Sequence, residues 1–139
     1  MNDSAARSVT TGDVKILFRY GDGSFGAPIR FFTGFHAEPR GVVAIDLNGD
    51  SNLDIIITNA DADNISVFFG YGNGTFRSFT ILSNEVTWPV LVAVENLNCD
   101  GYLDIVVVNY VHNHICILPG HNGKSFEREL ICPLLGHRL

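Results

Sequence analysis

The sequence predicts an all-β protein in which one unit of about 50 residues is repeated along the chain. One observation is the segment "AIDLNGDSNLDIII" from Ala44, in which polar residues on alternate positions run straight into β-branched residues; "AVENLNCDGYLDIVVV" from Ala93 closely resembles it. Another is "VFFGYGNGTF" from Val67, which recurs as "ILFRYGDGSF" from Ile16 and as "ILPGHNGKSF" from Ile117. No long stretch has helical periodicity, so the repeated unit is made of strands.

The central copy of the repeat predicts four short strands. They are Gly41–Ile45, Leu53–Asn59, Ile65–Tyr71 and Thr75–Leu82. The Asn-Gly pair at Asn73 lies between two apolar strands and is a strong hairpin signal, because both turn positions favour positive φ. Four strands per unit is the proportion of a β-propeller blade. The sequence therefore predicts a partial β-propeller of about two and a half four-stranded antiparallel blades.

This prediction divides the chain into five parts. They are an N-terminal polar segment (1–13), the outer half of a first blade (14–40), a complete second blade (41–89), a third blade (90–133) and a C-terminal tail (134–139). Propellers typically close with about four to eight blades. Two interpretations stay open: the chain is a fragment of a longer propeller, or several copies assemble to close a ring. The fragment is the simpler interpretation, because repeat arrays need capped ends.

Composition narrows the possible functions. A hydrophobic content of 46% in 139 residues indicates a folded chain with a sizeable core. Nine basic and fifteen acidic residues give a net charge of −6, and no Lys/Arg cluster is present, so we expect no nucleic-acid partner. We also expect no membrane span, because no apolar run reaches roughly 18 residues. The first residues lack the basic and apolar regions of a signal peptide.

The first acidic loop has the pattern of a metal-binding loop. Its candidate ligands are the side chains of Asp46, Asn48, Asp50 and Asp54 and the backbone carbonyl of Asn52. Oxygens on alternate positions of a curled loop can converge on one hard cation, and calcium accepts roughly six to eight such ligands in irregular geometry. Magnesium fits less well, and zinc would require His or Cys. The simpler alternative, that Asp and Asn only form turns, does not explain why the pattern recurs.

The second acidic loop offers a weaker set of ligands. They are the side chains of Asn96, Asn98, Asp100 and Asp104 and the backbone carbonyl of Tyr102. An amide has replaced the first carboxylate, which predicts weaker calcium binding than in the first loop. The second loop has one advantage: Gly101 stands where the first loop has Ser51, and positive φ at a non-glycine residue costs about 1 kcal/mol. An EF-hand is excluded because its position 12 requires Glu, and the loops have Ile57 and Val107 there.

"Phe25-Gly26-Ala27-Pro28", the pair Phe69-Gly70 and the acidic loops resemble the FG-GAP (VCBS-type) repeat, which is shared by integrin α-subunit propellers. The resemblance covers the chain from about Val14 to Leu130. It implies that the loops bind Ca²⁺. It also implies an extracellular or cell-surface location and a binding or adhesion role, with a protein or glycan as ligand.

We expect no enzymatic activity, because the sequence contains neither a Gly-x-Ser-x-Gly elbow nor a phosphate-binding loop. Two other functions stay open: a non-catalytic propeller part of a polysaccharide-acting enzyme, and a truncated structural fragment without independent activity. Cys116 and Cys132 are predicted to lie on adjacent antiparallel strands, so a disulfide between them also stays open.

Overall fold

The computed structural model describes residues 2–8, 13–19, 21–34, 36–83, 86–110 and 114–120. All of its regular elements are strands. They are β1 (Asn2–Ser8), β2 (Asp13–Arg19), β3 (Ile29–Phe32), β4 (Pro39–Ile45), β5 (Asp54–Asn59), β6 (Asn64–Phe68), β7 (Thr80–Ser83), β8 (Pro89–Glu95), β9 (Asp104–Asn109) and β10 (His114–Leu118). No helix in these residues is long and apolar enough to cross a membrane.

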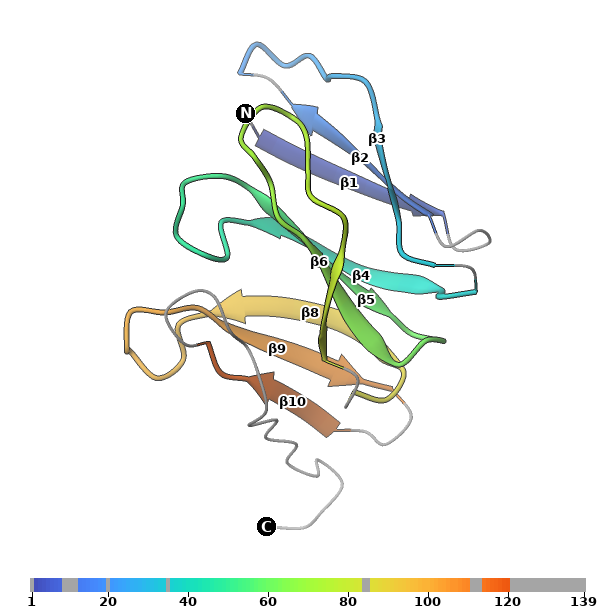
Figure 1. The fold of residues 1–139 in the computed structure, drawn as a ribbon, viewed down its shortest axis with the longest axis vertical. Coiled ribbons are helices and arrows are strands. Elements are labelled where there is room, and N and C mark those ends of the chain that lie inside the picture. Colours follow the sequence, from blue (N-terminus) through green and yellow to red (C-terminus); the bar gives the residue numbers. More distant parts are fainter. Residues whose placement is uncertain are drawn as a thin grey trace.

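The strands form three antiparallel sheets that follow one another along the stack (Figure 1). The first sheet has the order β1-β2-β3, the middle sheet β4-β5-β6-β7, and the third sheet β8-β9-β10. This arrangement confirms the predicted all-β fold of partial propeller blades. Within the described ranges the sheets do not close into a ring.

The middle sheet is covered on both faces, and β5 is its most buried strand. Ile55 and Ile57 contribute to a cluster with the first sheet, whereas Ile56 contributes to a cluster with the third sheet. All three side chains are 0% exposed. This double burial explains why β5 reads as an unbroken β-branched run rather than as an alternation of apolar and polar residues.

Two aromatic residues and a glycine join neighbouring sheets. Phe76 of the middle sheet packs edge-to-face against Phe31 of the first sheet, with ring centroids 4.9 Å apart. At the other interface, Gly41 lets β4 approach β8 closely. A Cβ on Gly41 would lie 2.9 Å from the carbonyl oxygen of Val90, which is tighter than van der Waals contact allows.

The first sheet has one strand more than the sequence predicted. Residues 1–13 were expected to be a polar segment, but Asn2–Ser8 form β1, which pairs with β2 from Asn2↔Arg19 to Ser8↔Asp13. The segment "NDSAARS" contains no apolar alternation that would reveal a strand. An edge strand is held by backbone hydrogen bonds on one side, so it needs no such pattern.

The fourth strand of the middle sheet is shorter than the predicted Thr75–Leu82. After β6, Gly70 and Phe76 form a single β-bridge, and the chain pairs again only from Thr80 in β7. The β6–β7 pairing also has a register shift at the far end of β7, between the pairs Ile65↔Ser83 and Ser66↔Ile81. Both the interruption and the register shift depend on the pairing in the folded sheet, so the sequence alone did not reveal them.

Some predictions concern residues that the structure does not describe. The predicted tail (134–139) and the last part of the predicted third blade are among them. Cys116 is disulfide-bonded, and Cys132 lies outside the described residues.

Candidate metal centre in the first acidic loop

The two acidic loops lie at the same edge of the stacked sheets (Figure 1, teal and orange loops). The first connects β4 to β5 and the second connects β8 to β9. They line one shared hollow, with Asp46 and Asn48 on one side and Tyr102 on the other. The repeat therefore places two related loops side by side.

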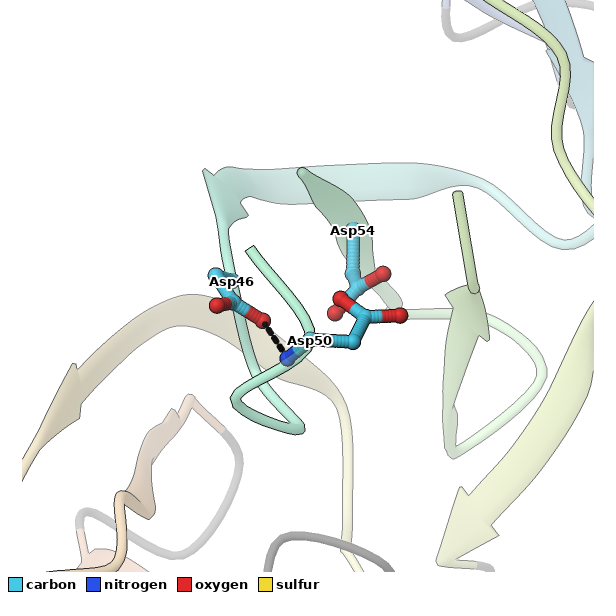
Figure 2. A group of neighbouring side chains, drawn as sticks. All are labelled: Asp46, Asp50 and Asp54. Atoms are coloured by element: carbon cyan, nitrogen blue, oxygen red, sulfur yellow. Dashed lines mark hydrogen bonds between the residues drawn. The ribbon is translucent and has the colours of Figure 1, made fainter. Parts of the chain in front are cut away.

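Three carboxylates gather in the first loop, as Figure 2 shows. Asp46, Asp50 and Asp54 each offer an oxygen, and these oxygens lie within 4.8 Å of one another. Asp50 is exposed, Asp46 is partly buried and Asp54 is fully buried. Three negative charges this close repel one another, so the group could hold a metal ion that removes the repulsion.

Asp46 is the centre around which the first loop curls. Its Oδ1 accepts hydrogen bonds from the backbone N–H groups of Gly49 (2.9 Å) and Asp50 (3.1 Å). Its Oδ2 accepts one from the N–H of Ser51 (2.8 Å). These hydrogen bonds hold the loop backbone in a turn that curls back toward the Asp46 carboxylate.

Asp54 anchors the loop to the sheet. Its Oδ2 accepts a hydrogen bond from the N–H of Leu47 (2.9 Å), and its Oδ1 accepts one from the N–H of Gly70 (2.9 Å). Burial raises the pKa of Asp54, the two N–H groups partly oppose that rise, and the charges of Asp50 and Asp46 add to it. A bound cation would act in the opposite direction and favour the ionised carboxylate.

Gly70 links the loop to the segment that follows β6. A Cβ at this position would overlap the carbonyl oxygen of Leu53, which immediately precedes Asp54. Only glycine allows this approach together with the hydrogen bond to Asp54. The Phe69-Gly70 pair is therefore part of the structure that holds the acidic loop.

The second loop has a buried carboxylate equivalent to Asp54, but no described residue that gathers the loop N–H groups as Asp46 does. Asp104 is 2% exposed and accepts hydrogen bonds from the N–H groups of Leu97 (2.9 Å) and Gly120 (2.8 Å), as Asp54 does in the first loop. Asp100 accepts one from the N–H of Tyr102 (2.9 Å). Among the described residues, no hydrogen bond reaches the side chain of Asn96, which occupies the position of Asp46.

Both loops place two residues in the left-handed region, but they place their glycine differently. In the first loop these residues are Gly49 (φ 79°) and Ser51 (φ 70°). In the second they are Cys99 (φ 59°) and Gly101 (φ 88°). The prediction from sequence rested on Ser51 and Gly101 alone, whereas Cys99 is also left-handed. Each loop therefore has one non-glycine residue at positive φ, and the backbone advantage predicted for the second loop disappears.

The structure thus brings the three predicted carboxylates of the first loop together, and Asn48 accepts a hydrogen bond from the N–H of Asp50 (3.3 Å). In the second loop Asn98 plays the same part toward Asp100 (3.3 Å). That the backbone carbonyl groups of Asn52 and Tyr102 would coordinate a metal ion stays a prediction. Sequence reasoning did not identify the N–H donors Leu47 and Gly70, because their approach to Asp54 depends on the folded sheet.

Residues 46–107 match the FG-GAP-like repeat family. The chain contains an FG-GAP-like repeat. No curated protein and no solved structure matches the chain significantly. The matched segment begins at Asp46 and runs through both acidic loops into β9, so the candidate metal centre belongs to the part of the chain that the family describes.

Proposed function

We propose that the chain is a calcium-binding FG-GAP-like module that serves in binding or adhesion on an extracellular or cell-surface protein. The observation that carries the calcium part is the group of Asp46, Asp50 and Asp54, whose oxygens lie within 4.8 Å of one another. Several loop N–H groups point at Asp46, so the loop is already curled. A preorganised loop loses little conformational entropy when it binds an ion.

The donor set fits calcium better than the other common divalent ions. The ligands would be the carboxylates of Asp46, Asp50 and Asp54, the side-chain oxygen of Asn48 and the carbonyl of Asn52. All of these donors are oxygens, which excludes a typical zinc site. The hydrogen bonds to Asp46 and Asp54 do not exclude coordination, because each carboxylate oxygen has two lone pairs. When bound, the ion would neutralise the clustered charges and tie the end of β4 to the start of β5.

The extracellular location and the adhesion role rest on the FG-GAP-like repeat. Extracellular calcium-binding modules work at roughly 10⁻⁴ to 10⁻³ M calcium, which suits an exposed loop with few charged ligands. The ligand would be a protein or a glycan, and the partners would include further blades or other copies of the chain. We propose a binding module and not an enzyme. A role as a propeller part of a polysaccharide-acting enzyme has no specific observation in its favour.

Thermal unfolding with calcium and with chelator tests the metal centre. A ligand that binds only the native state at 100 times its Kd adds about 2.7 kcal/mol to the free energy of unfolding. For a domain of this size we therefore expect calcium to raise the Tm by several degrees. Magnesium at the same concentration should raise it less.

The matched control is the double variant Asp46→Ala/Asp50→Ala, which removes two of the three carboxylates. Calcium should shift its Tm much less than that of the unmodified chain. An absent shift in the unmodified chain, or an equal shift in the double variant, would show that the first loop is not a calcium site.

A further inference from the structure

The side of the third sheet that faces away from the middle sheet is apolar. We call it the outer face; its residues are Leu91, Ala93, Val106, Val108, Ile115 and Ile117. Cross-strand pairing aligns them, because Val106 lies opposite both Ala93 and Ile117 in the register. The residues between them face the other way, and Ile105 and Val107 are buried against the middle sheet. Leu91 is 60% exposed, which is unusual for a leucine in a strand.

The repeat shows what this kind of face does elsewhere in the chain. With the two acidic loops aligned, Val106, Ile115 and Ile117 occupy the positions of Ile56, Ile65 and Val67 in the middle sheet. Those three residues are 0% exposed because the third sheet packs on them. The same surface is therefore covered in the middle sheet, and no described element packs on it in the third sheet. Because the equivalent face of the middle sheet is covered by a sheet, we expect the outer face to be covered by another apolar sheet face as well.

The opposite end of the stack is different. On β2, Val14 and Ile16 are buried toward the middle sheet, whereas Lys15 and Arg19 alternate with them and are exposed. Arg30 on the adjacent β3 is also exposed on that side, where its side chain is 58% accessible and pairs with Asp13. A charged end suits solvent, as in the capping units of repeat proteins.

The charges decide which surface of another copy can cover the outer face. Docking the first sheet of a second copy there would bury Lys15 and Arg19 together with the Arg30–Asp13 ion pair, and the outer face offers Lys15 and Arg19 only Glu95 at its rim among the described residues. Burying unpaired cations is costly. Docking the same apolar face of a second copy buries no cation and gives a closed two-fold contact.

We propose that the outer face of the third sheet is a dimerisation surface on which a second copy of the chain docks with the same face. The proposal specifies the partner within the proposed function, but it does not depend on the metal centre. A dimer that persists in chelator would therefore support it even if the calcium prediction fails.

Sedimentation velocity of the purified full chain over a wide concentration range tests the proposal. The expected result is a monomer–dimer equilibrium that Leu91→Lys weakens at least about tenfold in Kd, because the new charge would be buried at the contact. The matched control is Leu17→Lys on the outer side of β2, which should leave the dimer unchanged. Circular dichroism checks that both variants fold.

Ala93→Glu serves as a second variant, since Ala93 is exposed on the same face and the edge strand tolerates a charge. Three results would overturn the proposal. The first is a monomer at every concentration. The second is growth beyond a dimer, which indicates head-to-tail contacts. The third is a dimer that Leu17→Lys disrupts while Leu91→Lys and Ala93→Glu do not.

Discussion

The two acidic loops have the same anchor and different centres. Asp54 and Asp104 are both buried and both accept two backbone N–H groups, one from the loop and one from the segment after the next strand. Asp46 gathers three loop N–H groups, whereas its counterpart Asn96 gathers none among the described residues. The comparison separates two tasks within one motif: the last carboxylate joins the loop to the sheet, and the first shapes the loop and supplies charge.

The loops also share a backbone cost, which they carry at different residues. Ser51 and Cys99 each adopt positive φ without being glycine. Because the two costs are similar, about 1 kcal/mol each, they do not favour either loop. The difference in formal charge, three carboxylates in the first loop and two in the second, therefore remains as the reason to expect tighter calcium binding in the first.

Removing the anchors should have the largest effect. Asp54→Ala and Asp104→Ala each leave two N–H groups without their acceptor, so each should lower the free energy of unfolding by on the order of 3 kcal/mol in chelator. Chemical denaturation measures this loss. The control is Asp61→Ala, in the exposed turn between β5 and β6, which should change stability by less than about 0.5 kcal/mol.

The same two variants should differ in calcium binding. Asp54→Ala should weaken binding more than Asp104→Ala, because it disables the loop with more carboxylates. Titration calorimetry at a temperature where both variants are folded measures the difference. A larger loss from Asp104→Ala would mean that the charge count does not rank the sites.

Exchanging the first ligand should have the next largest effect. Asp46→Asn gives the first loop the amide of the second, and we expect calcium affinity to fall roughly tenfold, or about 1.4 kcal/mol. Asn96→Asp is the reciprocal change and should strengthen the second site by a similar factor. Calorimetric titration of both variants provides the measurement, and Asn48→Asp serves as the control for added charge at another position.

If Asn96→Asp does not strengthen binding, charge at the first position is not sufficient. The missing N–H contacts around Asn96 would then be the cause. The second loop would need a different backbone conformation as well as the added carboxylate.

Replacing the left-handed, non-glycine residues of the two loops with glycine should have the smallest effect on stability. Ser51→Gly and Cys99→Gly should each raise the free energy of unfolding by up to about 1 kcal/mol, reduced by the greater freedom of glycine in the unfolded chain. Gly49→Ala should lower it by a similar amount. The control is Gly21→Ala, where a Cβ would meet nothing and φ is not left-handed. Unequal gains at Ser51 and Cys99 would show that the two costs do not cancel.

The sequence predicted the elements that carry a strong local pattern. Leu53–Asn59 was expected to be a strand and Asp54–Asn59 is one, because a β-branched run between turn signals has few alternatives. The polar β1 could not be predicted, since its pairing with β2 depends on backbone groups that every residue has. The fourth strand was expected from Thr75, but after the bridge at Phe76 pairing resumes only at Thr80, and this break depends on the pairing in the folded sheet rather than on the local sequence pattern.

For the candidate site, spacing showed which side chains share a loop, but not how each carboxylate is used. That Gly70 donates to Asp54 depends on a contact sixteen residues away, which no local pattern contains. The left-handed Cys99 was missed for another reason. The glycine at Gly101 suggested that the second loop was free of backbone cost, although the left-handed position two residues earlier lacks a glycine.

The double burial of β5 has a consequence for how the molecule opens. Its backbone amides are shielded by a sheet on each side, so they should exchange with solvent only when the whole domain unfolds. The strands of the outer sheets have cover from one described neighbour and should exchange through smaller, local openings. Because Asp54 is the first residue of β5, the first loop is attached to the slowest-opening strand. Fraying at either end of the stack would then leave the geometry of its three carboxylates intact.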